Sequence, residues 1–149
     1  MRTIIAIWHS ADMGKTETIR AFANLLINNF QGNLVPIRPD IARVPVNGDF
    51  TLVVRINGVV IGITSQGDPR TGLEGRLQNL ADTHECNIIL CATRTRGETT
   101  TAVDRVARSR NYQTIWTSTY QIEGEANRRT VNDLKARHLL DLIQTLGLL

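Results

Sequence analysis

The stretch TIIAIWHSADMGKT, residues 3–16, decides the fold. Its first part, Thr3 to Trp8, is largely apolar, as in a strand buried on both faces of a parallel sheet. Gly14 then interrupts the pattern, and apolar residues recur at helical spacing from Lys15 to Asn29. A buried strand, a short loop with a glycine and an amphipathic helix together predict the opening unit of an α/β sheet.

The rest of the chain repeats this alternation of apolar runs and helical patterns. Asn57-Gly58 joins two β-branched runs, which is the strongest short-range signal for a hairpin. We expect further strands at 34–37, 50–56, 59–64 and 87–92 and within 112–120, and further helices at 71–83, 100–109 and 128–146. The expected architecture is a three-layer α/β/α fold with a mostly parallel sheet and one antiparallel hairpin strand, in a single domain over residues 1–149.

Composition narrows the classes of function. The chain has 149 residues, of which 42% are hydrophobic, and none of its apolar runs reaches the ~18 residues of a membrane span. The apolar N-terminus is too short for a signal peptide and no small-residue cleavage site follows it, so we expect a cytoplasmic protein without membrane partners. The net charge is +3, the arginines are spread and only 5% of residues are aromatic. This composition does not favour binding of single-stranded nucleic acid.

The loop after the first strand matches most of the phosphate-binding pattern G-x-x-x-x-G-K-[ST]. Gly14, Lys15 and Thr16 fit the pattern, and His9 stands where its first glycine would be. Lys15 is one of only two lysines in a chain that otherwise uses arginine. A lysine at this position is therefore less easily explained by chance.

Each residue type in the loop suits a triphosphate. Backbone N–H groups of such a loop point at the phosphates, and the N-terminal end of the next helix adds positive charge. Lys15 can reach the β- and γ-phosphates, and the Thr16 hydroxyl can bind Mg²⁺. The expected nucleotide-binding residues are Ser10, Ala11, Asp12, Met13, Gly14, Lys15, Thr16 and Glu17.

Two residues depart from what a phosphate loop needs. His9 requires a different turn from glycine, and Asp12 places a negative charge within the loop. The same residues also fit an ordinary strand–turn–helix in which Gly14 makes the turn.

The segment from Trp8 to Leu26 resembles the Walker A region of P-loop NTPases. The resemblance implies binding of ATP or another nucleoside triphosphate with Mg²⁺. The hairpin is similar to the one that precedes the D-x-x-G motif of small GTPases, but Thr64 takes the place of its aspartate and Gly67 alone matches. The guanine-recognition motif N-K-x-D is absent from the sequence, so the resemblance implies no preference for GTP.

Candidates for a metal-binding acid and for catalytic arginines lie further along the chain. No carboxylate directly follows the strand at 59–64, so Asp68, four residues beyond it, is the candidate metal residue, acting through water, unless Asp68-Pro69 only starts a turn. Arg94 and Arg96 follow the strand at 87–92, and small P-loop kinases close arginines over the transferred phosphoryl group. With Lys15 they are the candidate catalytic residues, unless their loop is merely solvated.

Three functions stay open at this point. The first is an ATP-dependent hydrolase or nucleotide switch, and the second is a kinase for a small molecule or a nucleotide. The third is a degenerate, non-catalytic domain that binds a protein partner or a second copy of itself. Cys86 and Cys91 flank or lie within an apolar run, and we expect both to be buried structural thiols rather than metal ligands.

Overall fold

The structure is a computed structural model that describes residues 1–9 and 14–149. Its strands and helices follow the alternation expected from the sequence. The strands are β1 (Thr3–Trp8), β2 (Leu34–Arg38), β3 (Thr51–Ile56), β4 (Val59–Thr64), β5 (Ile88–Thr93) and β6 (Gln113–Thr117). The helices are α1 (Lys15–Asn29), α2 (Leu73–Asp82), α3 (Glu98–Arg110) and α4 (Arg128–Thr145).

The six strands form one sheet in the order β2-β3-β4-β5-β1-β6. Strand β3 is antiparallel to both of its neighbours, and β4, β5, β1 and β6 pair in parallel. The expectation of a mostly parallel sheet with one antiparallel hairpin strand is therefore confirmed. The turn between β3 and β4 has positive φ at Asn57 (51°) and Gly58 (83°), as the Asn-Gly signal predicts.

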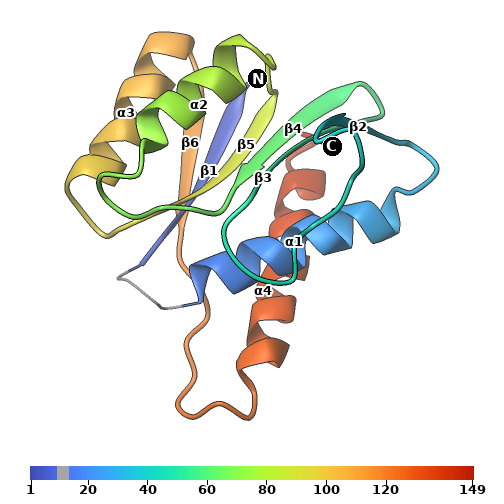
Figure 1. The fold of residues 1–149 in the computed structure, drawn as a ribbon, viewed down its shortest axis with the longest axis vertical. Coiled ribbons are helices and arrows are strands. Elements are labelled where there is room, and N and C mark those ends of the chain that lie inside the picture. Colours follow the sequence, from blue (N-terminus) through green and yellow to red (C-terminus); the bar gives the residue numbers. More distant parts are fainter. Residues whose placement is uncertain (10–13) are drawn as a thin grey trace.

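The helices cover the sheet on both faces, which gives three layers (Figure 1). Helices α1 and α4 lie against one face, and α2 and α3 lie against the other. Alternate residues of β1 serve the two cores, with Ile5 and Ile7 in the core under α1 and α4, and Ile4 and Ala6 in the core under α2 and α3. This double burial explains why β1 is apolar on both sides.

Large apolar side chains fix each helical layer. The layer of α1 and α4 buries Phe22, Leu26 and Leu139, and the layer of α2 and α3 buries Leu77 and Val103. Full burial of such side chains is worth about 1.5–3 kcal/mol each. The layers therefore hold the ends of β1 and its neighbours in place.

The strand order creates a switch point beside β1. Strand β1 pairs with β5 on one side and with β6 on the other. The helix that follows β1 packs on one face of the sheet, whereas the helix that follows β5 packs on the opposite face. In open α/β sheets ligands bind in the crevice at the carboxyl ends of strands at such a point. The loops that carry Lys15 and Arg94 thus leave the sheet at the position where a ligand is expected.

No helix within the described residues is long and apolar enough to cross a membrane.

Candidate functional site

Lys15 ties the ends of β1 and β5 together. Its ammonium donates hydrogen bonds to the backbone carbonyls of His9, at 3.1 Å, and Thr93, at 2.9 Å. The residue is only 7% exposed, although it opens α1. The positive charge of Lys15 is therefore held at the switch point, beside the N-terminal end of the helix.

Gly14 caps α1 in a conformation that other residues rarely adopt. Its φ is 78°, and a Cβ at this position would lie 3.2 Å from Oδ1 of Asn132 in α4. The same Oδ1 accepts a hydrogen bond from the Thr18 hydroxyl at 3.3 Å. The backbone thus favours glycine here and the close approach of α4 leaves little room for a side chain, in addition to the role that the phosphate-binding pattern predicts.

His9 joins the loop to β5 through its backbone. Its N–H donates to the carbonyl of Thr93 at 3.2 Å, and its ring stacks on Trp8 with centroids 6.3 Å apart. The residue that replaces the first glycine of the pattern is therefore fixed at the end of the strand. The remaining predicted loop residues, Ser10, Ala11, Asp12 and Met13, lie outside the described residues, and their role stays a prediction.

Thr16 lies beside an acid, Asp49, that sequence analysis did not single out. Its hydroxyl donates to Oδ1 of Asp49 at 3.4 Å, and the Ser65 hydroxyl donates to the same oxygen at 3.0 Å. Ser65 follows β4 directly and is buried, whereas Asp49 is exposed. Three segments distant in the sequence thus meet at the start of α1.

Asp68, the acid favoured from the sequence, contacts a different residue. Its Oδ1 lies 3.0 Å from Nε of Arg94, so the candidate metal residue and a candidate catalytic arginine form an ion pair. Arg94 is half-buried, and its backbone N–H donates to the buried Thr99 hydroxyl at 2.9 Å. Arg96 is exposed. The two arginines therefore differ, because among the described residues Arg94 is held through both its backbone and its side chain, whereas Arg96 lies at the surface.

Gly67 has a packing role that the D-x-x-G comparison did not suggest. A Cβ at Gly67 would lie 2.3 Å from the backbone oxygen of Ala92 in β5. Only glycine allows the loop after β4 to approach β5 so closely. The glycine therefore positions the segment that carries Ser65 and Asp68.

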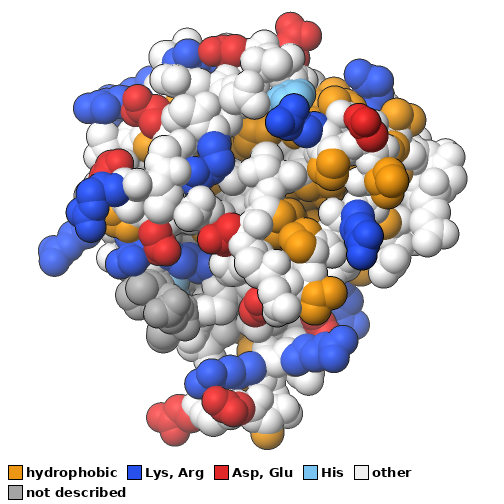
Figure 2. Space-filling model, viewed as in Figure 1, with side chains coloured by type: hydrophobic (Ala, Val, Ile, Leu, Met, Phe, Trp, Pro, Cys, Tyr) orange, Lys and Arg blue, Asp and Glu red, His pale blue; other side chains and the backbone are white. Residues whose placement is uncertain are grey.

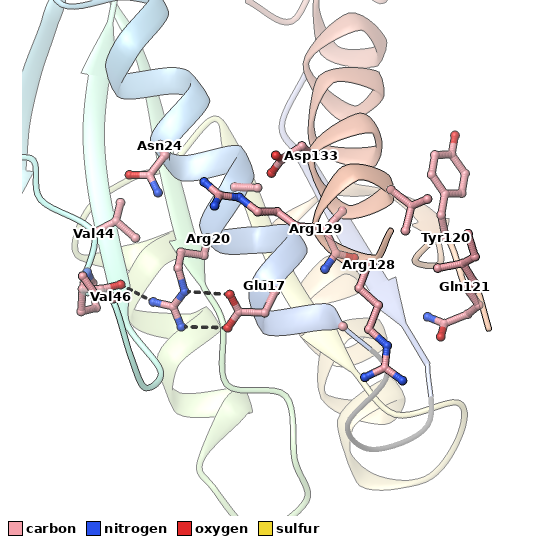
Figure 3. A pocket seen from close by; sticks show the side chains of 16 residues that line it. Glu17, Arg20, Asn24, Val44, Val46, Tyr120, Gln121, Arg128, Arg129 and Asp133 are labelled. Carbon is pink, nitrogen blue, oxygen red and sulfur yellow. Dashed lines mark hydrogen bonds and ion pairs between the residues drawn. The ribbon is translucent and has the colours of Figure 1, made fainter. Parts of the chain in front are cut away.

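A cavity opens beside Gly14, between α1 and α4 (Figure 3). Its volume is about 920 Å³. Side chains from α1, from the loop before β3, from the loop after β6 and from the start of α4 line it. The main ones are Glu17, Arg20, Asn24, Val44, Val46, Tyr120, Ile122, Arg128, Arg129 and Asp133. The cavity therefore offers apolar, aromatic and charged surfaces next to the phosphate-binding pattern.

Arg20 holds one wall of this cavity against α1. Its guanidinium donates to the carbonyls of Pro45 and Gly48, the latter at 2.9 Å, and pairs with Glu17 at 3.4 Å. Sequence analysis missed this contact, because the spacing of Glu17 and Arg20 indicates only a pair on one helix face. The clamp fixes the segment that ends at Asp49.

On the opposite wall, Lys135 approaches Tyr120. The ammonium lies 4.9 Å from the centre of the Tyr120 ring and donates to the Thr117 hydroxyl at 2.7 Å. Burial lowers the pKa of Lys135. The Tyr120 hydroxyl lies 2.6 Å from Nδ1 of His138. Lys135 and His138 therefore hold the Tyr120 side chain where it lines the cavity.

The described residues contain no group of three or more His, Cys, Asp or Glu side chains that could hold a metal ion. Any Mg²⁺ would need hydroxyl and phosphate oxygens beside a carboxylate, which is usual for this ion.

Cys86 and Cys91 are buried, as expected, and burial raises the pKa of each thiol to about 12.

Charges of both signs are interspersed over the face in Figure 2, which shows no extended basic surface on this side.

No family model, no curated protein and no solved structure matches the chain.

Proposed function

We propose that the protein binds a nucleoside triphosphate with Mg²⁺ at the carboxyl ends of β1 and β5, and acts as a hydrolase or nucleotide switch. One observation carries the proposal. The ammonium of Lys15 is held at the switch point of the sheet, at the start of α1 and next to the cavity. Fixed positive charge, helix N-terminus and cavity are the three elements that a bound nucleotide needs.

The charge at this point suits a triphosphate. The ammonium now donates to two carbonyls, which are neutral acceptors. Phosphate oxygens carry negative charge, so they attract the ammonium more strongly than a neutral carbonyl does. Lys15 would therefore exchange a carbonyl for a phosphate on binding.

The cavity suits the nucleoside. Gly14 lines both the loop and the cavity, so phosphates at the loop would leave the base and ribose beside α1 and α4. Tyr120 offers a ring on which a base can stack, and Ile122 and Val46 offer apolar contact. Glu17 and Asn24 supply hydrogen-bonding groups for a ribose or a base edge.

Catalysis would rest on the loop after β5. Arg94 leaves the sheet next to the strand that carries the phosphate-binding pattern. Once released from Asp68, its guanidinium could neutralise charge that develops on the transferred phosphoryl group. Arg96 is exposed in the same loop and could act on the nucleotide or on an acceptor.

Titration calorimetry tests the proposal with the wild-type protein and ATP in the presence of Mg²⁺. Lys15→Ala should weaken binding by roughly 2–4 kcal/mol, since each contact to a charged group is worth ~1.5–3 kcal/mol. The matched control is Arg108→Ala, which removes an exposed positive charge on α3 and should bind like wild type. Equal affinity of the Lys15 variant and the wild type would refute the phosphate-loop assignment.

A further inference from the structure

Thr16 lies in the first turn of α1, where a triphosphate would bring its metal ion, and one carboxylate lies within hydrogen-bonding distance of its hydroxyl. That carboxylate belongs to Asp49, at 3.4 Å. Asp49 immediately precedes Phe50 and the antiparallel strand β3, which begins at the edge where the parallel strands end. An acid at the start of an antiparallel strand can thus replace one at the end of a parallel strand.

Several contacts hold Asp49 in this position. The buried Ser65 hydroxyl accepts from the Phe50 N–H at 2.8 Å and donates to the Asp49 carboxylate at 3.0 Å. Arg20 binds the carbonyls of Pro45 and Gly48, which lie just before Asp49 in the chain. The carboxylate is therefore oriented from both sides while it stays exposed to solvent.

The electrostatic surroundings distinguish Asp49 from Asp68. Asp68 is paired with the guanidinium of Arg94 at 3.0 Å, so a cation already occupies its carboxylate. Asp49 acts electrostatically on Arg76, whose pKa is lowered by burial and raised by the Asp49 charge. Arg76 itself donates to the Thr64 hydroxyl and to the Gln66 carbonyl instead.

We propose that Asp49 and the Thr16 hydroxyl form the protein's part of the Mg²⁺ site, with Ser65 as a positioning residue. Both donors are oxygens, which Mg²⁺ prefers, and a site with one carboxylate leaves room for phosphate oxygens and water. Asp49 thereby takes the role for which Asp68 was the candidate from the sequence. The inference rests on the proposed nucleotide function, because the phosphates would supply the remaining ligands.

The experiment measures how much Mg²⁺ strengthens binding of a fluorescent ATP analogue. Each protein is titrated once with excess Mg²⁺ and once with EDTA, and the ratio of the two dissociation constants is compared. Asp49→Asn keeps an oxygen that can accept from Ser65 and Thr16 but removes the charge. It should lower the ratio by about tenfold or more, the effect of one lost charge-assisted contact. Its affinity in EDTA should not fall.

Three further variants sharpen the result. Asp40→Asn removes an exposed acid from the same connecting segment and should keep the wild-type ratio. Asp68→Asn should change the ratio less than Asp49→Asn does. Ser65→Ala should lower it by an intermediate amount, because the carboxylate loses its orientation. Electron paramagnetic resonance of Mn²⁺ added with the analogue gives an independent readout, with weaker retention of the ion expected in the Asp49 variant.

The outcomes separate this inference from the proposed function. A wild-type protein that binds the analogue under neither condition refutes both. A wild-type ratio in the folded Asp49→Asn variant, or in a second charge-neutral variant, Asp49→Ser, refutes only the metal site. If the ratio of the dissociation constants falls only in Asp68→Asn, Asp68 is the metal-binding carboxylate instead of Asp49. Thermal unfolding confirms that each variant is folded.

Discussion

A basic side chain binds backbone carbonyls at each end of β1, and the two sets of contacts differ. At the amino end, Arg2 donates to the carbonyls of Ala81, Cys86 and Arg110 and lies 4.2 Å from the centre of the Tyr112 ring. At the carboxyl end, Lys15 donates to two carbonyls beside a cavity of about 920 Å³.

The difference follows from the residue types and their surroundings. The planar guanidinium of Arg2 donates to three acceptors at once and stacks on an aromatic ring. Such an arrangement suits a contact that stays formed in the folded protein. The ammonium of Lys15 has a flexible stem and three rotatable donors, so it can exchange acceptors. The amino end therefore serves stability, and the carboxyl end has the features of a binding site.

The largest effects are expected when each basic residue is replaced by alanine. One variant should lose ATP affinity and the other should lose stability. Lys15→Ala should weaken ATP binding by roughly 30–1000-fold, and it should lower the free energy of unfolding less than Arg2→Ala does, because fewer hydrogen bonds are lost. Arg2→Ala should leave the affinity for ATP unchanged and lower the free energy of unfolding by about 2–4 kcal/mol, because several hydrogen bonds and a cation–π contact are lost. Calorimetric titration and urea unfolding measure the two quantities. A loss of affinity in the Arg2 variant would contradict the contrast.

The second prediction concerns turnover at the carboxyl end. If the protein is a hydrolase, Arg94→Ala or Arg96→Ala should lower kcat by about 10–1000-fold, the range for one lost electrostatic donor. Nucleotide affinity should change much less, because the contact forms in the transition state. Lysine should rescue poorly, since it lacks the planar fork of arginine. A phosphate-release assay with Arg108→Ala as control decides the point, and full kcat in both alanine variants would make the loop a mere connector.

The third prediction uses pH to probe the amino end. Burial raises the pKa of the Cys86 thiol to about 12, and burial likewise raises the pKa of the Tyr112 hydroxyl to about 12. Both groups favour their protonated forms in the folded state. Their stabilisation is complete below the pKa values of the unfolded chain, about 9 for the thiol and about 10 for the phenol. It is lost as the pH rises from there to about 12.

Urea unfolding at several pH values should show this loss. Each group contributes a slope of up to about 1.4 kcal/mol per pH unit. Cys86→Ala should reduce the slope above pH 9, where the thiol titrates in the unfolded chain. A slope in the variant equal to that of the wild type would assign the loss to other groups.

The smallest effect is expected for the choice of base. Because the sequence lacks N-K-x-D, ATP and GTP should bind with dissociation constants within about tenfold of each other, or ~1.4 kcal/mol. Competition of each nucleotide against a fluorescent ATP analogue measures the ratio. A preference for GTP of more than about a hundredfold would reveal a guanine site among the residues that line the cavity.

The local elements of this fold were predictable from the sequence. The apolar run of β1, the helical repeat of α1 and Asn57-Gly58 each carry a strong periodic or turn signal, and the structure has the elements they predict. The order of the strands was not predictable, because a buried strand shows that it has two neighbours without showing which. The position of β5 between the hairpin and β1 is therefore information that only the structure supplies.

The candidate site divides in the same way. Lys15 and Thr16 could be selected from the sequence because their pattern is contiguous. The contacts of Asp49 with Thr16 and of Asp68 with Arg94 join segments far apart in the chain. Local sequence patterns do not predict contacts of this kind. One signal was available for Asp49, since the first residues of an antiparallel strand lie at the edge where its parallel neighbours end.

The position of β1 between β5 and the edge strand β6 also has a consequence for how the chain folds. Thr3 pairs with Ile88 on one side and with Gln113 on the other, so the first strand to be synthesised obtains its partners among the last. Pairing over such separations is slow, because the entropy of closing a long loop is lost before any contact compensates for it. During synthesis β1 would remain an apolar segment without its neighbours, exposed to aggregation until β6 has emerged. A fragment that ends before β6 would leave one edge of β1 open, and it would lack the loop after β6 and the helix α4 that complete the cavity.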